Sequence, residues 1–177
     1  MLHSLRQVLV LLACAAVLCA VVGQLNHYAA PWAVTFSVPG LLVVFAALRL
    51  PLGAGFAAAF TTGLWLDAAT PLSFGSHALL LALAFCLVHR LRSRLPREQV
   101  MVSVVTALFV NLGLFVLLAL LAIGGLPDPA SGGLRLLADL FVSQLLTALI
   151  GPWFLAFQAA SLRLAGAAPM QVVNRYA

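Results

Sequence analysis

Residues 7–48 read QVLVLLACAAVLCAVVGQLNHYAAPWAVTFSVPGLLVVFAAL and carry no formal charge unless His27 is protonated. Arg6 and Arg49 are the charged residues on either side of this stretch. One helix that crosses the hydrocarbon core of a bilayer needs about 20 predominantly apolar residues. The 42 residues between the two arginines are about twice that length. The stretch therefore predicts two membrane-spanning helices in series.

A polar break divides these two helices. Residues 23–28, GQLNHY, are followed closely by Pro31, which favours a turn at this point. We therefore expect helices at residues 7–25 and 32–48. Pro39 and Gly40 fall within the second helix, where a proline is expected to produce a kink.

The composition agrees with a protein embedded in lipid. Hydrophobic residues make up 64% of the chain and charged residues only 7%, whereas a soluble domain carries about 25% charged residues. So few charges cannot cover a water-facing surface, but a hydrocarbon solvent removes that need. We expect an all-α, polytopic membrane protein that forms a single transmembrane domain over residues 1–177.

The remaining apolar stretches predict four more spans. With the first two, the expected helices cover residues 7–25, 32–48, 51–67, 76–89, 101–123 and 140–162. The apolar run after Arg6 continues to Leu25, which favours a retained helix over a cleaved signal peptide. The longest loop is expected at residues 124–138, which are rich in glycine and proline.

The arginines predict the orientation. All nine basic residues are arginine, and such residues concentrate in cytoplasmic loops. With six spans and both termini in the cytoplasm, only Arg135 lies on the outer side, together with Asp67, Asp128 and Asp139. We therefore expect a multi-pass membrane protein with both termini in the cytoplasm. The arginines are expected to contact lipid headgroups, and nucleic acid is not an expected partner.

One group of arginines follows the fourth predicted helix: Arg90, Arg92, Arg94 and Arg97. Its simplest role is to set the topology and contact lipid headgroups, at about 1 kcal/mol for each basic residue. A cytoplasmic partner with an acidic face is the alternative.

Small residues recur every four positions on the third predicted helix, at Gly55, Ala59 and Gly63. This spacing lets two helix backbones approach closely in lipid. The neighbour is either another helix of the same chain or the helix of a partner. The sequence leaves both alternatives open.

Asp67 and His77 are the next candidates for a functional site. Asp67 ends the third predicted helix, and His77 lies near the start of the fourth, where the two side chains can pair. An acid at a helix end can also bond to the turn that follows it. The chain contains no catalytic group of nucleophile, base and orienting residue, no metal-ligand spacing and no phosphate loop. We therefore expect neither enzymatic activity nor a cofactor.

Residues 63–78, GLWLDAATPLSFGSHA, resemble the signature of the bacterial rod shape-determining protein MreD family. Members typically have a glycine, a hydrophobic pair and an aspartate, then a turn with proline and glycine, and then a His-Ala pair at the next helix. In this chain residues 72–74 separate Pro71 from Gly75. The resemblance selects Gly63, Asp67, Gly75 and His77 as residues of the turn.

The resemblance implies a non-enzymatic scaffold in the machinery that elongates rod-shaped cells and builds their lateral peptidoglycan. The implied partners are MreC and, through it, MreB and the wall polymerase and transpeptidase. It also implies a fold similar to the substrate-binding subunits of energy-coupling-factor transporters. The alternative function is therefore a small-molecule-binding subunit of an ATP-driven uptake transporter, with an outward-facing polar cavity near Asp67, Asn111 and Gln144.

Overall fold

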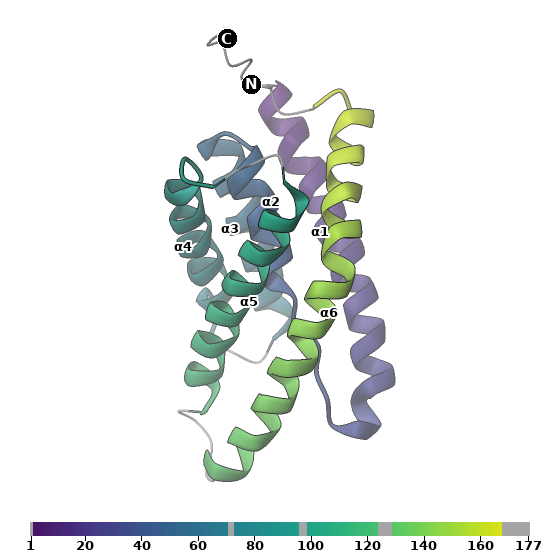
Figure 1. Cartoon of the computed structure of the whole chain (residues 1–177), viewed down its shortest axis with the longest axis vertical. Helices are drawn as coiled ribbons and strands as arrows, with labels where there is room; N and C mark the ends of the chain where they lie inside the picture. The colour runs from purple at the N-terminus through teal and green to yellow at the C-terminus, as the bar shows by residue number, and fades with distance from the viewer. Residues whose placement is uncertain (1, 71–72, 96–98, 124–128, 168–177) are drawn as a thin grey trace.

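The computed structural model describes residues 2–70, 73–95, 99–123 and 129–167. These residues form an all-helical bundle without strands (Figure 1). In chain order the helices are α1 (Leu2–Ala29), the short 3-10 helix η1 (Ala30–Trp32), α2 (Pro39–Arg49), α3 (Leu52–Ala69), α4 (Ser76–Leu91), α5 (Val100–Ile123) and α6 (Pro129–Leu164).

Three helical segments are long and apolar enough to cross a membrane: Leu2–Trp32, Val100–Leu121 and Arg135–Leu164. Helices α2 and α4 are apolar but shorter, with 11 and 16 residues. Large apolar side chains such as Phe109, Phe141 and Trp153 are more than two-thirds exposed, as expected for surfaces that face lipid. The prediction of an all-α membrane protein is therefore confirmed at this level.

Most predicted helices are found close to their expected positions. Helices α3, α4 and α5 begin and end within two residues of the predicted 51–67, 76–89 and 101–123. Helix α1 is longer than 7–25 at both ends. Helix α6 begins at Pro129, so the predicted loop at 124–138 is wrong for residues 129–138.

The prediction for residues 32–48 is wrong in its first third. Residues 34–38 are not helical, and α2 begins at Pro39 instead of bending there. Proline is favoured in the first turn of a helix because it needs no partner for an N–H group. It also disfavours helical backbone at the preceding residue, and Val38 has φ −129°.

The non-helical segment 34–38 is held by side chains from three helices. The backbone N–H and C=O groups of Phe36 bond to the side chain of Asn26 on α1, at 2.6 and 3.1 Å. The N–H of Ser37 donates to Oγ of Ser143 on α6 at 3.0 Å. Nδ2 of Asn111 on α5 donates to the carbonyl of Ser37 at 3.2 Å. These bonds replace the intrahelical ones, as irregular backbone inside a membrane protein requires.

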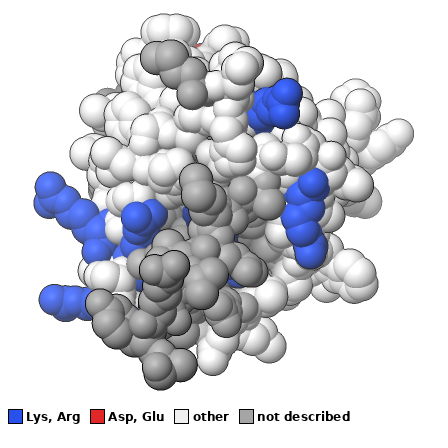
Figure 2. All heavy atoms as spheres, turned by 90° about the horizontal axis from the view of Figure 1, so that it is seen from above, with Lys and Arg blue, Asp and Glu red and all other residues white. Residues whose placement is uncertain are grey.

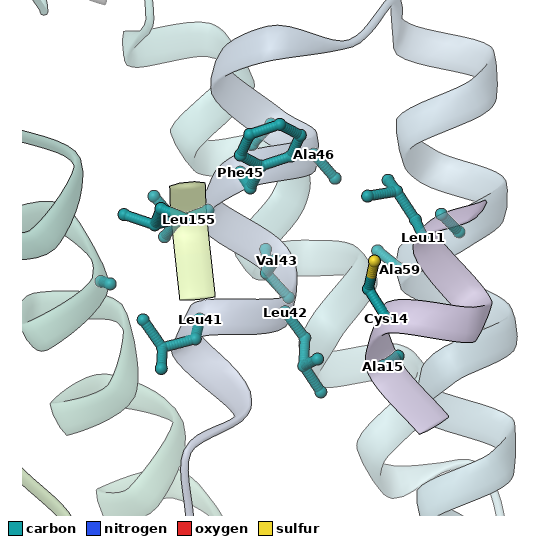
Figure 3. Packing of buried hydrophobic residues seen from close by; sticks show 14 of the residues in the cluster. Leu11, Cys14, Ala15, Leu41, Leu42, Val43, Phe45, Ala46, Ala59 and Leu155 are labelled. Atoms are coloured by element: carbon teal, nitrogen blue, oxygen red, sulfur yellow. The ribbon is translucent and has the colours of Figure 1, made fainter. Parts of the chain in front are cut away.

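Helix α2 lies at the centre of the bundle. Every residue from Pro39 to Leu48 is buried, which is the pattern of a helix surrounded by others on all sides. Figure 3 shows its side chains between Leu11 and Cys14 of α1 on one side and Leu155 of α6 on the other. Helix α2 also packs against α3, α4 and α5.

Basic side chains bond to the C-terminal end of α2. Nδ1 of His89 lies 3.2 Å from the carbonyl oxygen of Ala47, and Nη1 of Arg92 donates to that of Leu50 at 3.0 Å. Both side chains belong to the end of α4 or the turn that follows it. They therefore bond to carbonyl groups that the last turn of a helix leaves without intrahelical donors.

Gly40 is expected to be required for the packing of α2 on α5. A Cβ at this position would lie 2.5 Å from the carbonyl oxygen of Ala107 and 2.8 Å from the backbone nitrogen of Asn111. Gly40→Ala should therefore destabilise the protein by about 1–3 kcal/mol, the usual effect of overpacking. The apparent Tm of the purified protein in mild detergent measures this effect.

Gly113→Ala on α5 is the matched control, because a Cβ there has no neighbouring atom within 4 Å. It should leave Tm unchanged or raise it, since alanine favours a helix over glycine by about 1 kcal/mol. Equal Tm values for the two variants would contradict the close packing of Gly40.

Candidate functional site

The carboxylate of Asp67 joins the end of α3 to the start of α4. Oδ1 accepts a hydrogen bond from the backbone N–H of His77 at 2.8 Å. Oδ2 accepts from the backbone N–H groups of Gly75 at 3.0 Å and Ala78 at 3.1 Å. One side chain therefore binds three amide groups at the beginning of the next helix.

This arrangement is a helix cap supplied from a distance in sequence. The first N–H groups of a helix have no intrahelical acceptor, and a cap is usually the side chain of the residue at the helix start. Here that residue is Gly75, which has no side chain, and its φ of +97° suits glycine. Asp67 supplies the missing acceptor, and its negative charge is favourable at a helix N-terminus.

The His77 side chain completes the turn. Its Nδ1 lies 3.0 Å from Oδ1 of Asp67, and both side chains are buried. Since an ionised carboxylate only accepts hydrogen bonds, Nδ1 carries the proton in this contact. The hydroxyl of Thr70 lies 3.5 Å from the same nitrogen and donates to the carbonyl of Leu66 at 3.0 Å. The predicted pairing of Asp67 with His77 is thus present in the structure.

The small residues of α3 pack within the chain. A Cβ on Gly63 would lie 2.4 Å from Cα of Ala78, so the backbones of α3 and α4 touch beside the Asp67 cap. A Cβ on Gly55 would lie 2.5 Å from the ring of Phe85 on α4. Ala59 between them is buried. Of the two alternatives for this ridge, the structure shows a helix of the same chain as the neighbour.

The arginines at the C-terminal end of α4 and just after it lie apart from this turn. Arg90 and Arg94 are exposed, whereas Arg92 is half-buried and bonds to the carbonyl of Leu50. Arg97 lies outside the described residues. Arg90, Arg92 and Arg94 therefore lie at the C-terminal end of α4, whereas Asp67 caps its N-terminal end (Figure 1).

A second buried carboxylate was not predicted from the sequence. Asp139 was expected in an outer loop, but it lies on α6 and is buried. Its two oxygens accept hydrogen bonds from the backbone N–H of Thr35 at 2.8 Å and from the hydroxyl of Thr35 at 2.7 Å. The sequence signal that bears on this role is TFSVP at residues 35–39, where β-branched residues precede a proline. Such a stretch disfavours a helix, so its backbone N–H groups need acceptors elsewhere in the protein.

The amides of Asn111 and Gln144 are used inside the bundle. Oδ1 of Asn111 accepts from the N–H of Gly40 at 3.3 Å, and Nε2 of Gln144 donates to the carbonyl of Leu108 at 3.1 Å. The first bond joins α5 to α2, and the second joins α6 to α5.

Among the described residues, no three His, Cys, Asp or Glu side chains are grouped so that they could hold a metal ion. No protein-family model, curated protein or solved structure matches the chain. The role of the site is therefore inferred from its geometry.

Asp67→Ala is expected to destabilise the protein more than His77→Ala. The first variant leaves three amide groups without their acceptor, which should cost roughly 2–5 kcal/mol. The second removes one side-chain contact but leaves the Asp67 carboxylate bonded to the backbone N–H groups, so it should cost about 1–2 kcal/mol. Thermal unfolding in detergent ranks the two variants.

Ser73→Ala serves as the control in this series, because the Ser73 hydroxyl is exposed and, among the described residues, bonds to that of Ser76 at 2.7 Å. It should change stability by less than about 0.5 kcal/mol. If His77→Ala proved as damaging as Asp67→Ala, the imidazole and not the carboxylate would hold the turn.

Proposed function

We propose that this protein is a non-enzymatic, six-pass membrane scaffold of the rod-shape elongation complex, akin to the MreD family. The observation that carries the proposal is the Asp67 cap. The residues that bear the family resemblance, Gly63, Asp67, Gly75 and His77, meet in one turn between α3 and α4. A motif that builds a rigid turn at the bundle end suits a protein that presents a surface to partners.

In the proposed topology, the end of the bundle where α1 begins and α6 terminates faces the cytoplasm. The described arginines at this end are Arg6, Arg49, Arg90, Arg92, Arg94 and Arg163, against Arg135 alone near the other end. Figure 2 looks onto this end and shows blue arginine side chains on both sides of the face, with almost no red. Such an excess of arginine marks the cytoplasmic side.

The short helix α2 is compatible with a full crossing. Its 11 residues cover about 16 Å at 1.5 Å per residue. The preceding five non-helical residues can add at most roughly 16 Å at about 3.3 Å per residue. Together they match the hydrocarbon core of about 30 Å. In Figure 1 this non-helical segment, residues 34–38, rises along the bundle to the start of α2.

The turn that Asp67 holds carries an exposed aromatic side chain. Phe74 precedes Gly75 and is 75% exposed, and Trp65 on the last turns of α3 is 49% exposed. Exposed aromatic residues on a rigid support are favourable anchors for a partner protein. We assign this surface, Trp65 and Phe74, to the membrane-adjacent part of a bitopic partner such as MreC, and through it to MreB and the wall polymerase and transpeptidase.

The uptake-transporter alternative has less support. It requires a polar cavity near Asp67, Asn111 and Gln144, but these side chains bond to backbone groups as described above. Two cavities of about 450 and 230 Å³ are lined mainly by apolar side chains, and none of the three residues lines either of them.

Single cysteines test the topology. In a background with Cys14, Cys19 and Cys86 replaced by alanine, Ser73→Cys should react with a membrane-impermeant maleimide added outside intact spheroplasts. Ser93→Cys should react only after permeabilisation, because residues 73 and 93 lie at opposite ends of α4 and both are exposed. Labelling of both positions from the same side would overturn the topology.

Co-purification with MreC tests the scaffold role. Phe74→Ala should reduce recovery of MreC in mild detergent about tenfold, as expected for loss of an aromatic anchor. Tm should stay unchanged, since Phe74 is largely exposed. Phe109→Ala is the matched control, because Phe109 is 71% exposed on α5. Full recovery of MreC with both Phe74→Ala and Asp67→Ala would count against this surface.

A further inference from the structure

A cavity of about 230 Å³ lies between α2, α5 and α6 at the arginine-rich end of the bundle. Its walls are mainly apolar and include Phe45, Leu48 and Leu155. Two arginines from different helices complete the lining, Arg49 at the end of α2 and Arg163 near the end of α6. No acidic residue of the described chain lines it.

The two arginines are available for a ligand. Both are exposed, and Nε of Arg163 donates to the carbonyl of Ala159 at 3.3 Å, which anchors the side chain on its own helix. The described acids, Asp67 and Asp139, are bonded to His77 and Thr35 in other parts of the structure. Two guanidinium groups beside a cavity attract an anion, and their planar donors fit a phosphate.

The N-terminus of α5 adds to this preference, whereas α2 and α6 contribute their C-terminal ends, where the arginines offset the negative end of each helix dipole. Val100 and Ser103 of the first turn of α5 line the cavity, and a helix N-terminus favours negative charge. The remaining walls favour hydrocarbon. An amphiphile with an anionic phosphate and acyl chains matches both parts.

From these features we propose that the cavity binds the phosphate headgroup of an anionic phospholipid. Arg49 and Arg163 bind the phosphate, and the first carbons of an acyl chain contact Phe45 and Leu155. The volume is below the 300–1,000 Å³ of sites that enclose a whole small molecule, so the rest of the lipid lies in the bilayer. Basic pockets between transmembrane helices on the cytoplasmic side suit such headgroups.

This site is distinct from the group of arginines at the end of α4 and just after it. Arg90, Arg92 and Arg94 belong to one short stretch of chain, and Arg92 already bonds to the carbonyl of Leu50. Arg49 and Arg163 instead belong to segments more than 100 residues apart in sequence, brought to one cavity by the packing of α2 on α6.

Native mass spectrometry of the purified protein can count bound lipids during titration with phosphatidylglycerol. We expect one tightly bound lipid. Arg49→Gln and Arg163→Gln should each weaken its binding about fivefold, from roughly 1 kcal/mol per basic residue, and the double variant about 25-fold. Arg94→Gln, an exposed arginine at the same end, should leave it unchanged.

Two further ligands identify the source of the anion. Phosphatidylcholine should bind more weakly, because its headgroup has no net charge. Inorganic phosphate should not displace the lipid at equal concentration, and efficient displacement would replace the proposal with a site for free phosphate. Because the titration is done in detergent, its result does not depend on the proposed topology or on the scaffold role.

Unchanged phosphatidylglycerol binding in Arg49→Gln and Arg163→Gln would overturn the proposal, as would an equal loss in Arg94→Gln. Lipid-free Tm values verify that the variants are folded. If the glutamine variants fail to fold, Ala156→Leu decides, because Ala156 is an exposed residue of the cavity lining and both arginines remain. A larger side chain there should reduce lipid binding, and normal binding would overturn the proposal.

Discussion

Backbone amide groups that leave a helix and are buried in the protein have no water to bond to, so the protein itself must bond to them. This constraint governs both breaks described here. Between α3 and α4 the acceptor is Asp67, which binds three amide groups at the start of α4. Before α2 the partners are side chains of α1, α5 and α6. Among them Asp139 accepts hydrogen bonds from the amide and the hydroxyl of Thr35. The two described acids of the chain therefore both serve to bond to backbone.

Close packing brings these partners within reach. Lipid provides no hydrophobic drive between helices, so contact depends on small residues and dispersion. Gly63 lets α3 touch the first turn of α4, and Gly40 lets α2 touch α5 beside Asn111. At each place a glycine contact lies next to the polar side chain that bonds to the break. Packing and hydrogen bonding are therefore coupled, and a larger side chain at either glycine would disturb both.

The two ends of the bundle have different chemistry. At one end the described acids, Asp67 and Asp139, are buried and bonded, and Phe74 in the turn before α4 is exposed. At the other end Arg49 and Arg163 line a mainly apolar cavity, and Arg92 bonds to the carbonyl of Leu50 after α2. The scaffold role that we propose requires a fixed surface for protein partners and a stable position in the bilayer. The end that carries Phe74 suits a surface for partners, and the end that carries the arginines suits a stable position in the bilayer.

Sequence alone determined the helical class, the approximate bounds of α3, α4 and α5, and the pairing of Asp67 with His77. These features follow from apolar run length and from residues close together in the chain. The tertiary structure decided the path of residues 34–38 and the role of Asp139, which bonds to a residue 104 positions away. Run length could not reveal them, because residues 34–38 are largely apolar and their backbone is bonded by side chains of α1, α5 and α6 that only the packing brings together.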